Sequence, residues 1–211
     1  LTISEGSGAA TLTPADDGTL TVTGEQVGSD TFTLTVGGHS TQVTVTVGME
    51  EKQAQSFADA TNWGSEYARA TGALAAAEGH EGNPGLRMTY DFTQSTATRG
   101  AYAILPSARG GSTGTELEGQ PLELRLWIKG DGSGAWPRIQ VVTGDGVTTN
   151  LDGPTITWTG WQQATFTVPT GTAYPLTLQR VRIMETRSTA SYLGDITVSD
   201  LSVVVPPDSV A

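Results

Sequence analysis

The stretch LRLWIKGDGSGAWPRIQVV, residues 124–142, decides the fold because it contains two segments with the two-residue period of a β-strand. Aliphatic residues alternate with polar or aromatic ones over 124–129 and again over 137–142. Alternation of this kind places successive side chains on opposite faces of a β-sheet. We therefore predict two strands joined by a glycine-rich hairpin turn at 130–134. Their aliphatic face belongs to the core, and their polar, aromatic face lies outside.

The composition of the chain excludes several classes of function. Of the 211 residues, 22 are acidic and 11 are basic, so the formal net charge is -11. A chain this acidic disfavours duplex nucleic acid, which needs a basic surface, and it has no apolar run that would span a bilayer. We therefore expect neither a nucleic-acid nor a membrane partner. The absence of cysteine excludes disulfides and thiolate metal sites.

Residues 1–48 are predicted to form a small β module. The alternating stretches ATLT, LTVT, TFTLTV and TQVTVTV are separated by the turn signals DDG at 16–18 and GGH at 37–39. This pattern resembles the later strands of bacterial immunoglobulin-like domains, with the first strand or two missing. The resemblance implies a truncated module that acts as a spacer.

The larger unit, residues 49–206, contains many short candidate strands and almost no helix signal. Such a pattern favours an antiparallel sandwich. The stretch 67–77 is ambiguous, because its alanines suit a helix whereas Gly72 and the neighbouring threonine favour a β-hairpin, which we predict. Residues 207–211 are expected to be a tail.

Four motifs of the larger unit occur in a set order: GLRMTYDF at 85–92, WIKGDGSG at 127–134, WTGW at 158–161 and ITVSDL at 196–201. Together they resemble jelly-roll carbohydrate-binding modules. More narrowly, they resemble the non-catalytic β-sandwich domain appended to bacterial phosphodiester glycosidases of the exopolysaccharide type. The resemblance implies an all-β chain, with a partial immunoglobulin-like module followed by a jelly-roll β-sandwich. It also implies a polysaccharide ligand, a catalytic domain in the same polypeptide, a secreted or cell-surface location, and a core position for Trp161.

Arginine and aromatic residues at outward strand positions are the candidate ligand-binding residues. Basic residues are scarce, and nine of the 11 are arginine. Guanidinium groups bind carboxylates or phosphates bidentately, so an arginine-rich face suits an anionic glycan, and an exposed indole can stack on a sugar ring. The predicted set is Arg125, Trp127, Trp136, Arg138, Gln140, Arg182, Tyr102 and, at the rim, Arg99. The alternative is that each arginine pairs with a neighbouring carboxylate on an ordinary solvated face.

The same resemblance implies a structural Ca²⁺ between the first and last strands of the sandwich. Calcium prefers hard oxygen ligands, including carboxylates and backbone carbonyls. Asp200 lies at the matching position of the last strand, and Asp59 or Glu51 would face it from the opening strand. The alternative is that Asp200 caps a turn or faces solvent.

No catalytic constellation stands out in the sequence. A glycosidase needs two carboxyl groups at a defined separation, and nothing distinguishes such a pair from solvated charges here. Two histidines without cysteine suggest no hydrolytic triad. We therefore predict a non-catalytic module that keeps an appended catalytic domain near its polysaccharide substrate. Two alternatives stay open: a structural sandwich that packs against that domain, and a polysaccharide lyase or glycoside hydrolase on a jelly-roll fold.

Overall fold

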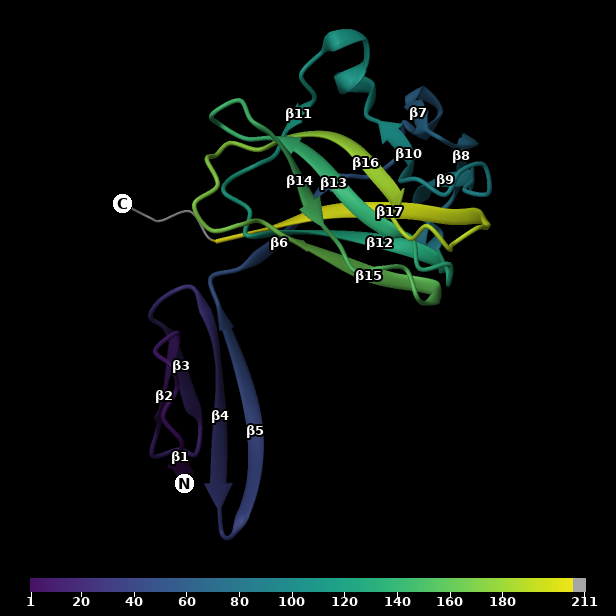
Figure 1. The fold of residues 1–211 in the computed structure, drawn as a ribbon. Coiled ribbons are helices and arrows are strands. Elements are labelled where there is room, and N and C mark those ends of the chain that lie inside the picture. Colours follow the sequence, from purple (N-terminus) through teal and green to yellow (C-terminus); the bar gives the residue numbers. More distant parts are fainter. Residues whose placement is uncertain (207–211) are drawn as a thin grey trace. The chain divides into compact units, whose positions relative to one another are not determined.

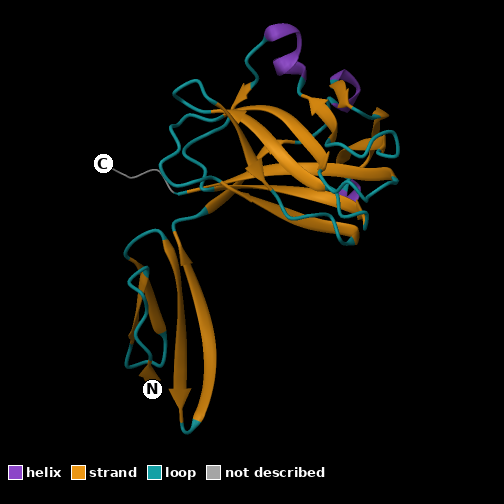
Figure 2. Cartoon of the chain, in the orientation of Figure 1, coloured by secondary structure: helices purple, strands orange, loops and turns teal. Residues whose placement is uncertain are grey.

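The computed structural model describes residues 1–206 and consists almost entirely of β-strands, which confirms the all-β prediction (Figures 1 and 2). The chain divides into two compact units between Glu50 and Glu51, and Val205 and Pro206 are grouped with the first unit. The tail predicted at 207–211 lies outside the described residues. Within residues 1–206, no helix has the length and apolar character needed to span a membrane.

The first unit has a small core. Its strands are β1 (Thr2–Ile3), β2 (Ala10–Pro14), β3 (Leu20–Gly24), β4 (Gly28–Val36) and β5 (His39–Val47). They form the sheet β1-β4-β5 and the hairpin β2-β3. Phe32 is buried beside Asp30, whose carboxylate accepts hydrogen bonds from Ser7 and from the backbone of Gly8 and Ala10. The bond from the Ser7 hydroxyl, and after it that from the backbone of Ala10, lower the pKa of Asp30 to about 2. The immunoglobulin-like identity of this unit stays a prediction.

The second unit is a sandwich of two antiparallel sheets (Figure 1). One sheet, called here the β13 sheet, has the order β14-β13-β16-β10-β7, with β11 paired to β16. The other, the β12 sheet, has the order β15-β12-β17-β9-β8, with β6 paired to β17.

The elements of this unit have the following bounds: β6 (Glu50–Gln55), η1 (Ala60–Asn62), β7 (Gly64–Ala68), β8 (Thr71–Glu78), η2 (His80–Gly82), β9 (Pro84–Asp91), β10 (Arg99–Ile104), η3 (Pro106–Gly111), β11 (Thr115–Glu116), β12 (Glu123–Asp131), β13 (Trp136–Val142), β14 (Thr148–Asp152), β15 (Thr159–Thr167), β16 (Thr177–Glu185) and β17 (Leu193–Val205). The elements labelled η are short 3-10 helices. Among the described residues of this unit, the regular structure is otherwise strand.

Aliphatic side chains from both sheets meet between them and form the core. Leu124, Leu126 and Ile128 of β12 are fully buried, as are Ile139 and Val141 of β13. Burying one such side chain stabilises the fold by about 1.5–3 kcal/mol. Arg125, Trp127, Arg138 and Gln140, which alternate with these residues, are half-buried and lie on the outer faces of the sandwich. The inward half of the predicted alternation is therefore confirmed.

The predicted hairpin turn at 130–134 is wrong. Strand β12 pairs with β15 and β17, whereas β13 pairs with β14 and β16, so the chain crosses from one sheet to the other between them. The two strands belong to facing sheets, and each turns its aliphatic side toward the core between them. The alternation in the sequence is therefore the same as it would be in a hairpin. The stretch 67–77 contains strand, as predicted, but β7 and β8 also belong to different sheets and form no hairpin.

Candidate functional site

The predicted ligand-binding residues lie in three places and not on one face, because β12 and β13 belong to different sheets. Trp136, Arg138, Gln140, Arg182 and Tyr102 lie on the β13 sheet, Arg125 and Trp127 lie on the β12 sheet, and Arg99 is buried. The expectation of a single surface is therefore wrong. The two outer faces are described separately below.

The outer face of the β13 sheet, called here the arginine face, is defined by side chains from five strands. They are Trp136, Arg138 and Gln140 of β13, Asn150 and Asp152 of β14, Arg180 and Arg182 of β16, Tyr102 of β10 and Glu66 of β7. The strand register places Asp152, Arg138, Arg182, Tyr102 and Glu66 opposite one another in a single row. The sheet therefore brings together charged residues that are far apart in the sequence.

Carboxylates of this face satisfy two of its three arginines. Arg138 Nε lies 2.6 Å from Asp152 Oδ1, and Arg180 Nη1 lies 2.8 Å from Glu66 Oε2. The guanidinium of Arg182 has no carboxylate partner within residues 1–206, and it donates from Nη1 to the neutral Asn150 Oδ1 at 2.8 Å. Its Nε is buried and has no hydrogen-bond partner in that part of the chain. Arg182 is thus the under-satisfied group at the centre of the row.

Two aromatic rings support the arginines of this face. The guanidinium of Arg138 lies 4.4 Å from the ring centroid of Trp136, and that of Arg182 lies 4.7 Å from the centroid of Tyr102. Such cation–π contacts fix the orientation of a guanidinium. Tyr102 is only 8% exposed, so it acts as a support for Arg182 and presents little surface to a ligand. Trp136 is half-buried, and its stacking on a sugar stays a prediction.

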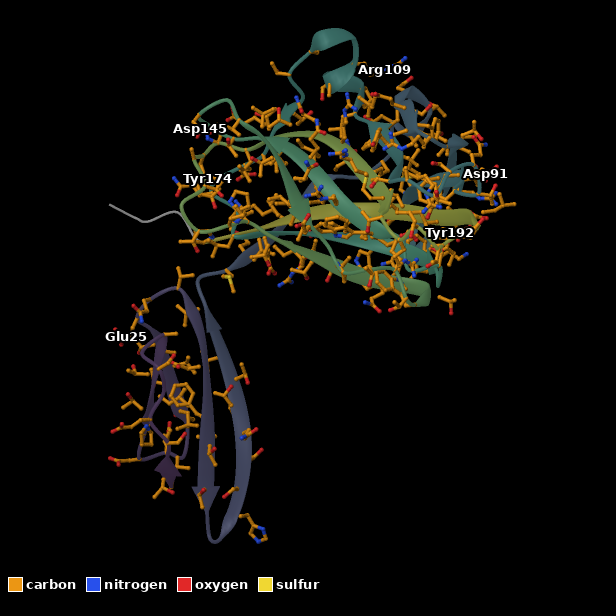
Figure 3. All side chains as sticks on the ribbon, viewed as in Figure 1. Glu25, Asp91, Arg109, Asp145, Tyr174 and Tyr192 are labelled. Atoms are coloured by element: carbon orange, nitrogen blue, oxygen red, sulfur yellow. The ribbon has the colours of Figure 1, made fainter. Side chains whose placement is uncertain are left out.

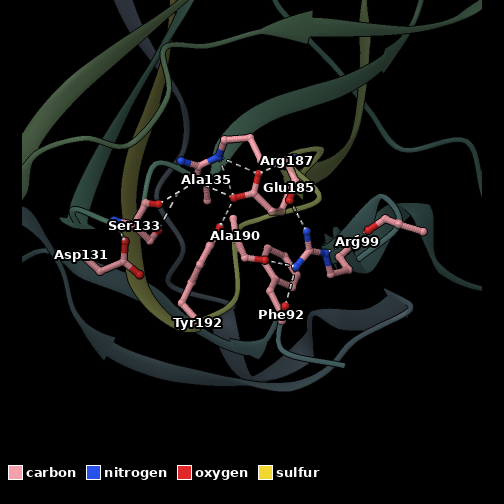
Figure 4. Close-up of polar contacts among 10 residues, drawn as sticks. Phe92, Arg99, Asp131, Ser133, Ala135, Glu185, Arg187, Ala190 and Tyr192 are labelled. Atoms are coloured by element: carbon pink, nitrogen blue, oxygen red, sulfur yellow. Dashed lines mark hydrogen bonds and ion pairs between the residues drawn. The ribbon is translucent and has the colours of Figure 1, made fainter. Parts of the chain in front are cut away.

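Arg99 does not rim a binding surface. It is fully buried, and its guanidinium donates to the carbonyl oxygens of Ala97, Phe92, Ala190 and Arg187 at 2.6–3.0 Å (Figure 4). A buried arginine needs such a set of acceptors to compensate for its desolvation. The role predicted for Arg99 in ligand binding is therefore wrong, because its donors tie together loops at one end of the sandwich.

The outer face of the β12 sheet, called here the histidine–tryptophan face, contains Arg125, Trp127, Trp161 and His80. The imidazole of His80 stacks on Trp127 with 3.6 Å between ring centroids and 8° between planes, and it meets Trp161 edge-on at 5.7 Å. Trp161 pairs with Lys129 in the sheet and is half-buried on this face, so the core position expected for it is wrong. His80 lies in the short 3-10 helix η2, where no periodicity of the sequence predicts its contact with Trp127.

Arg125 is fully engaged by carboxylates on this second face. It donates from Nε to Glu123 Oε1 at 2.7 Å and from Nη1 to Glu51 Oε2 at 2.9 Å. Glu51 also accepts hydrogen bonds from Gln163 and Ser202. Burial alone would raise the pKa of Glu51, but the bonds from Ser202, Gln163 and Arg125 outweigh it and lower this pKa below its usual value. For Arg125, the alternative of pairing with neighbouring carboxylates is what the structure contains.

The residues predicted to hold calcium have separate partners. Asp200 accepts hydrogen bonds from Gln53 Nε2 and Asn83 Nδ2 at 2.8 and 2.9 Å. Asp59 accepts one from Trp63 Nε1 at 2.9 Å, and Glu51 binds Arg125 as described above. In the described part of the chain, no group of three acidic or histidine side chains is placed to hold a metal ion. Calcium binding at these residues therefore stays a prediction, without a preformed cluster of carboxylates.

Comparisons with known proteins give only distant similarities. No protein-family model matches the chain, and no curated protein does. One similar solved structure is the family 11 carbohydrate-binding module of the cellulosomal cellulase Lic26A-Cel5E of Clostridium thermocellum. It is 18% identical with a TM-score of 0.46, over 77% of this chain and 96% of that chain. The family 30 module of the cellulase Cel9D-Cel44B of the same organism is 18% identical with a TM-score of 0.44, over 70% and 91%. These likenesses assign neither a family nor a ligand.

Proposed function

We propose that this chain is a non-catalytic module that binds an anionic polysaccharide through the arginine face. The observation that carries the proposal is the pair Arg138 and Arg182, which lie directly opposite each other on β13 and β16. Like charges opposite one another destabilise a sheet, and Asp152 is the one carboxylate bonded to this pair within residues 1–206. A ligand carboxylate at this place would supply the missing counter-charge.

The chemistry of Arg182 suits a planar anionic group such as the carboxylate of a uronate. Its guanidinium has five N–H donors, of which one is bonded to Asn150. Tyr102 beneath it holds the plane of the guanidinium, so few degrees of freedom remain to be ordered when a carboxylate binds. The planar guanidinium of arginine can donate two parallel hydrogen bonds to one carboxylate.

Neutral polar groups beside the arginines suit the hydroxyl groups of a sugar. Gln140 donates to Gln179 at 2.9 Å, and Asn150 lies directly opposite Gln140 on β14. Amide side chains both donate and accept hydrogen bonds, as hydroxyl recognition requires. The arginine face thus offers groups for the charge of an acidic glycan and for its hydroxyls.

The carboxylates of the arginine face support binding over catalysis. Asp152 and Glu66 belong to β14 and β7, which are the edge strands at opposite sides of the sheet. Each is bonded to an arginine. Acid–base cleavage of a glycosidic bond needs two carboxyl groups that flank one bond, which this arrangement does not offer.

We further propose that the module acts within a longer polypeptide, secreted or at the cell surface. There it would keep a catalytic domain, such as one of the phosphodiester-glycosidase type, close to its polymer. Attachment through a second site raises the effective concentration of substrate without any chemistry in the module.

The test begins with the wild-type chain on an array of uronate, sulfated, phosphorylated and neutral glycans. It continues with calorimetric titration of oligogalacturonate and of a neutral galactan oligomer of equal length. We expect at least about tenfold tighter binding of the acidic oligomer, and about a tenfold loss in Arg182→Ala, because a charge-assisted bidentate pair is removed. Arg125→Ala, on the opposite face, is the matched control and should leave the affinity unchanged.

Each outcome of this test decides a different part of the proposal. Binding to no glycan on the array would overturn it entirely. Equal affinity for acidic and neutral oligomers would overturn the anionic preference. A loss in Arg125→Ala without one in Arg182→Ala would move the site to the other face, and turnover of a bound polymer would show an enzyme.

A further inference from the structure

We infer that Arg187, which lies outside the arginine face, positions that face by holding the crossover 132–135 that leads into Trp136 and Arg138. This inference rests on the proposed function, because it concerns the affinity of the same face. Arg187 belongs to the connection between β16 and β17, at the end of the sandwich where Tyr192 also lies (Figures 3 and 4).

Arg187 is anchored by a buried carboxylate. The side chain of Glu185 is only 3% exposed, and it accepts hydrogen bonds from the backbone N–H of Arg187, from its guanidinium Nε and Nη2, and from Tyr192 Oη. Burial alone would raise the pKa of Glu185, but these bonds outweigh it and lower the pKa below its usual value. Glu185 is therefore ionised at neutral pH and holds the guanidinium in one place.

The backbone of Arg187 is fixed independently of its side chain. Arg99 Nη2 donates to the carbonyl oxygen of Arg187 at 2.6 Å, and Arg99 Nη1 donates to that of Ala190, also at 2.6 Å. Because Arg99 is fully buried, this attachment is part of the scaffold. The guanidinium of Arg187 thus projects from a rigid base.

The same guanidinium also reaches the crossover between the two sheets. Arg187 Nη2 donates to the carbonyl oxygen of Ser133 at 2.8 Å. The next residue, Gly134, has φ +78°, and a Cβ atom there would lie 2.9 Å from Arg187 Nη2. Glycine at 134 therefore serves two requirements: the left-handed backbone, and room for the guanidinium.

The crossover determines where β13 begins. Its other side is held by backbone hydrogen bonds between Gly134 and Ile156 and between Ile156 and Ala135, each 2.8 Å. Trp136 follows at once and pairs with Met184 in the sheet, and Arg138 stacks on its ring. From the β16–β17 connection, the guanidinium of Arg187 bonds to this crossover at Ser133, which also interacts with the hydroxyl of Tyr192. Loss of the Arg187 side chain would leave the ring and the stacked guanidinium less ordered before a ligand binds.

Loss of preorganisation lowers affinity without removing a contact to the ligand. Ordering a side chain on binding costs an amount that corresponds to a loss of about three- to tenfold in affinity. The Arg187 side chain is 52% exposed, but its truncation leaves the buried Glu185 carboxylate without its cation. The free energy of unfolding of Arg187→Ala is therefore measured beside its affinity, and Arg187→Lys, which keeps the positive charge, separates lost stability from lost positioning.

The test is a double-mutant cycle with oligogalacturonate, or with the acidic glycan that binds tightest on the array. We expect Arg187→Ala to weaken binding about three- to tenfold in the wild-type background and to have no further effect in Trp136→Ala. Arg187→Lys should recover part of the loss, because a lysine can still donate to Ser133. Arg69→Ala is the matched control, because exposed Arg69 also donates to a loop carbonyl, that of Thr98, away from the crossover.

A second readout needs no ligand. In the free protein, the indole N–H resonance of Trp136 should broaden or shift in Arg187→Ala, while that of Trp63 stays in place. An unchanged Trp136 resonance, or an equal loss of affinity in both backgrounds, would overturn the inference. If the wild type binds no glycan, the proposed function fails, and the resonance of Trp136 still decides whether Arg187 orders it.

Discussion

The two outer faces of the sandwich carry the same kinds of residue, but their arginines differ in the number of carboxylates bonded to them. On the histidine–tryptophan face, Arg125 bonds to both Glu123 and Glu51. On the arginine face, Arg138 and Arg182 oppose each other with a single bonded carboxylate in the described structure. Trp127 and Trp136 each have one ring face covered, by His80 and by Arg138, so aromatic stacking does not separate the faces. The two faces differ in the number of carboxylates that accept hydrogen bonds from their arginines.

The largest expected effect concerns the scaffold beneath both faces. Arg99→Ala should lower the free energy of unfolding by about 3 kcal/mol or more, because buried carbonyl groups lose their donors. Urea unfolding followed by tryptophan fluorescence reports on the second unit alone, since all five tryptophans lie in it. Arg69→Ala, the exposed counterpart, should change stability by less than about 0.5 kcal/mol. Lost glycan binding at unchanged stability would return Arg99 to the ligand site.

The second largest expected effect concerns His80, whose ring covers Trp127 on the histidine–tryptophan face. His80→Ala should destabilise the second unit by about 1 kcal/mol, because a stacked aromatic pair is lost. Affinity for the acidic glycan, measured by calorimetry, should stay within twofold, about the precision of the comparison. A clear loss of affinity would show that both faces take part in binding.

A smaller effect is expected when the arginine face loses the carboxylate that is bonded to Arg138. Asp152→Asn frees Arg138 from its carboxylate and should raise the affinity for the acidic oligomer by about three- to fivefold, because an exposed ion pair contributes no more than about 1 kcal/mol. Glu51→Gln is the matched change on the other face and should create no such gain. A weaker affinity in Asp152→Asn would mean that Asp152 itself contacts the sugar.

The smallest effect is the response of the histidine–tryptophan face to acid. The pKa of Glu51 is lowered in the folded state, so its contribution is complete above its unfolded pKa and is lost as the pH falls through the folded one. The difference in melting temperature between wild type and Glu51→Gln should therefore be present at pH 6 and close toward pH 3. A difference that widens on acidification would contradict this assignment.

Period-2 alternation in the sequence predicts many of the strands, but it does not predict which strands share a sheet. Alternation predicted the strands around 124–129 and 137–142 and their buried residues. It did not show that these strands lie in different sheets, because a glycine-rich stretch serves a hairpin and a crossover equally well. For that reason the sequence pattern places Arg125 and Trp127 with the residues of the arginine face, on which the structure does not put them.

Arg99 and His80 show what local pattern leaves out. Strand β10 is buried on both sides from Arg99 to Ala103, so alternation gives no direction for its arginine. The carbonyls that satisfy Arg99 come from loops as distant in sequence as Ala190. His80 stacks on Trp127 across 47 positions of the chain, a contact made by the loop before β9. Only the tertiary structure brings these partners together.

The indole N–H signals of the five tryptophans test most directly the central claim that the arginine face alone binds the glycan. The measurement is a proton–nitrogen correlation spectrum of the ¹⁵N-labelled chain during titration with oligogalacturonate. We predict that the signal of Trp136 moves in proportion to saturation while those of Trp127 and Trp161 stay in place. Movement of the Trp127 or Trp161 signals with a stationary Trp136 would contradict the claim.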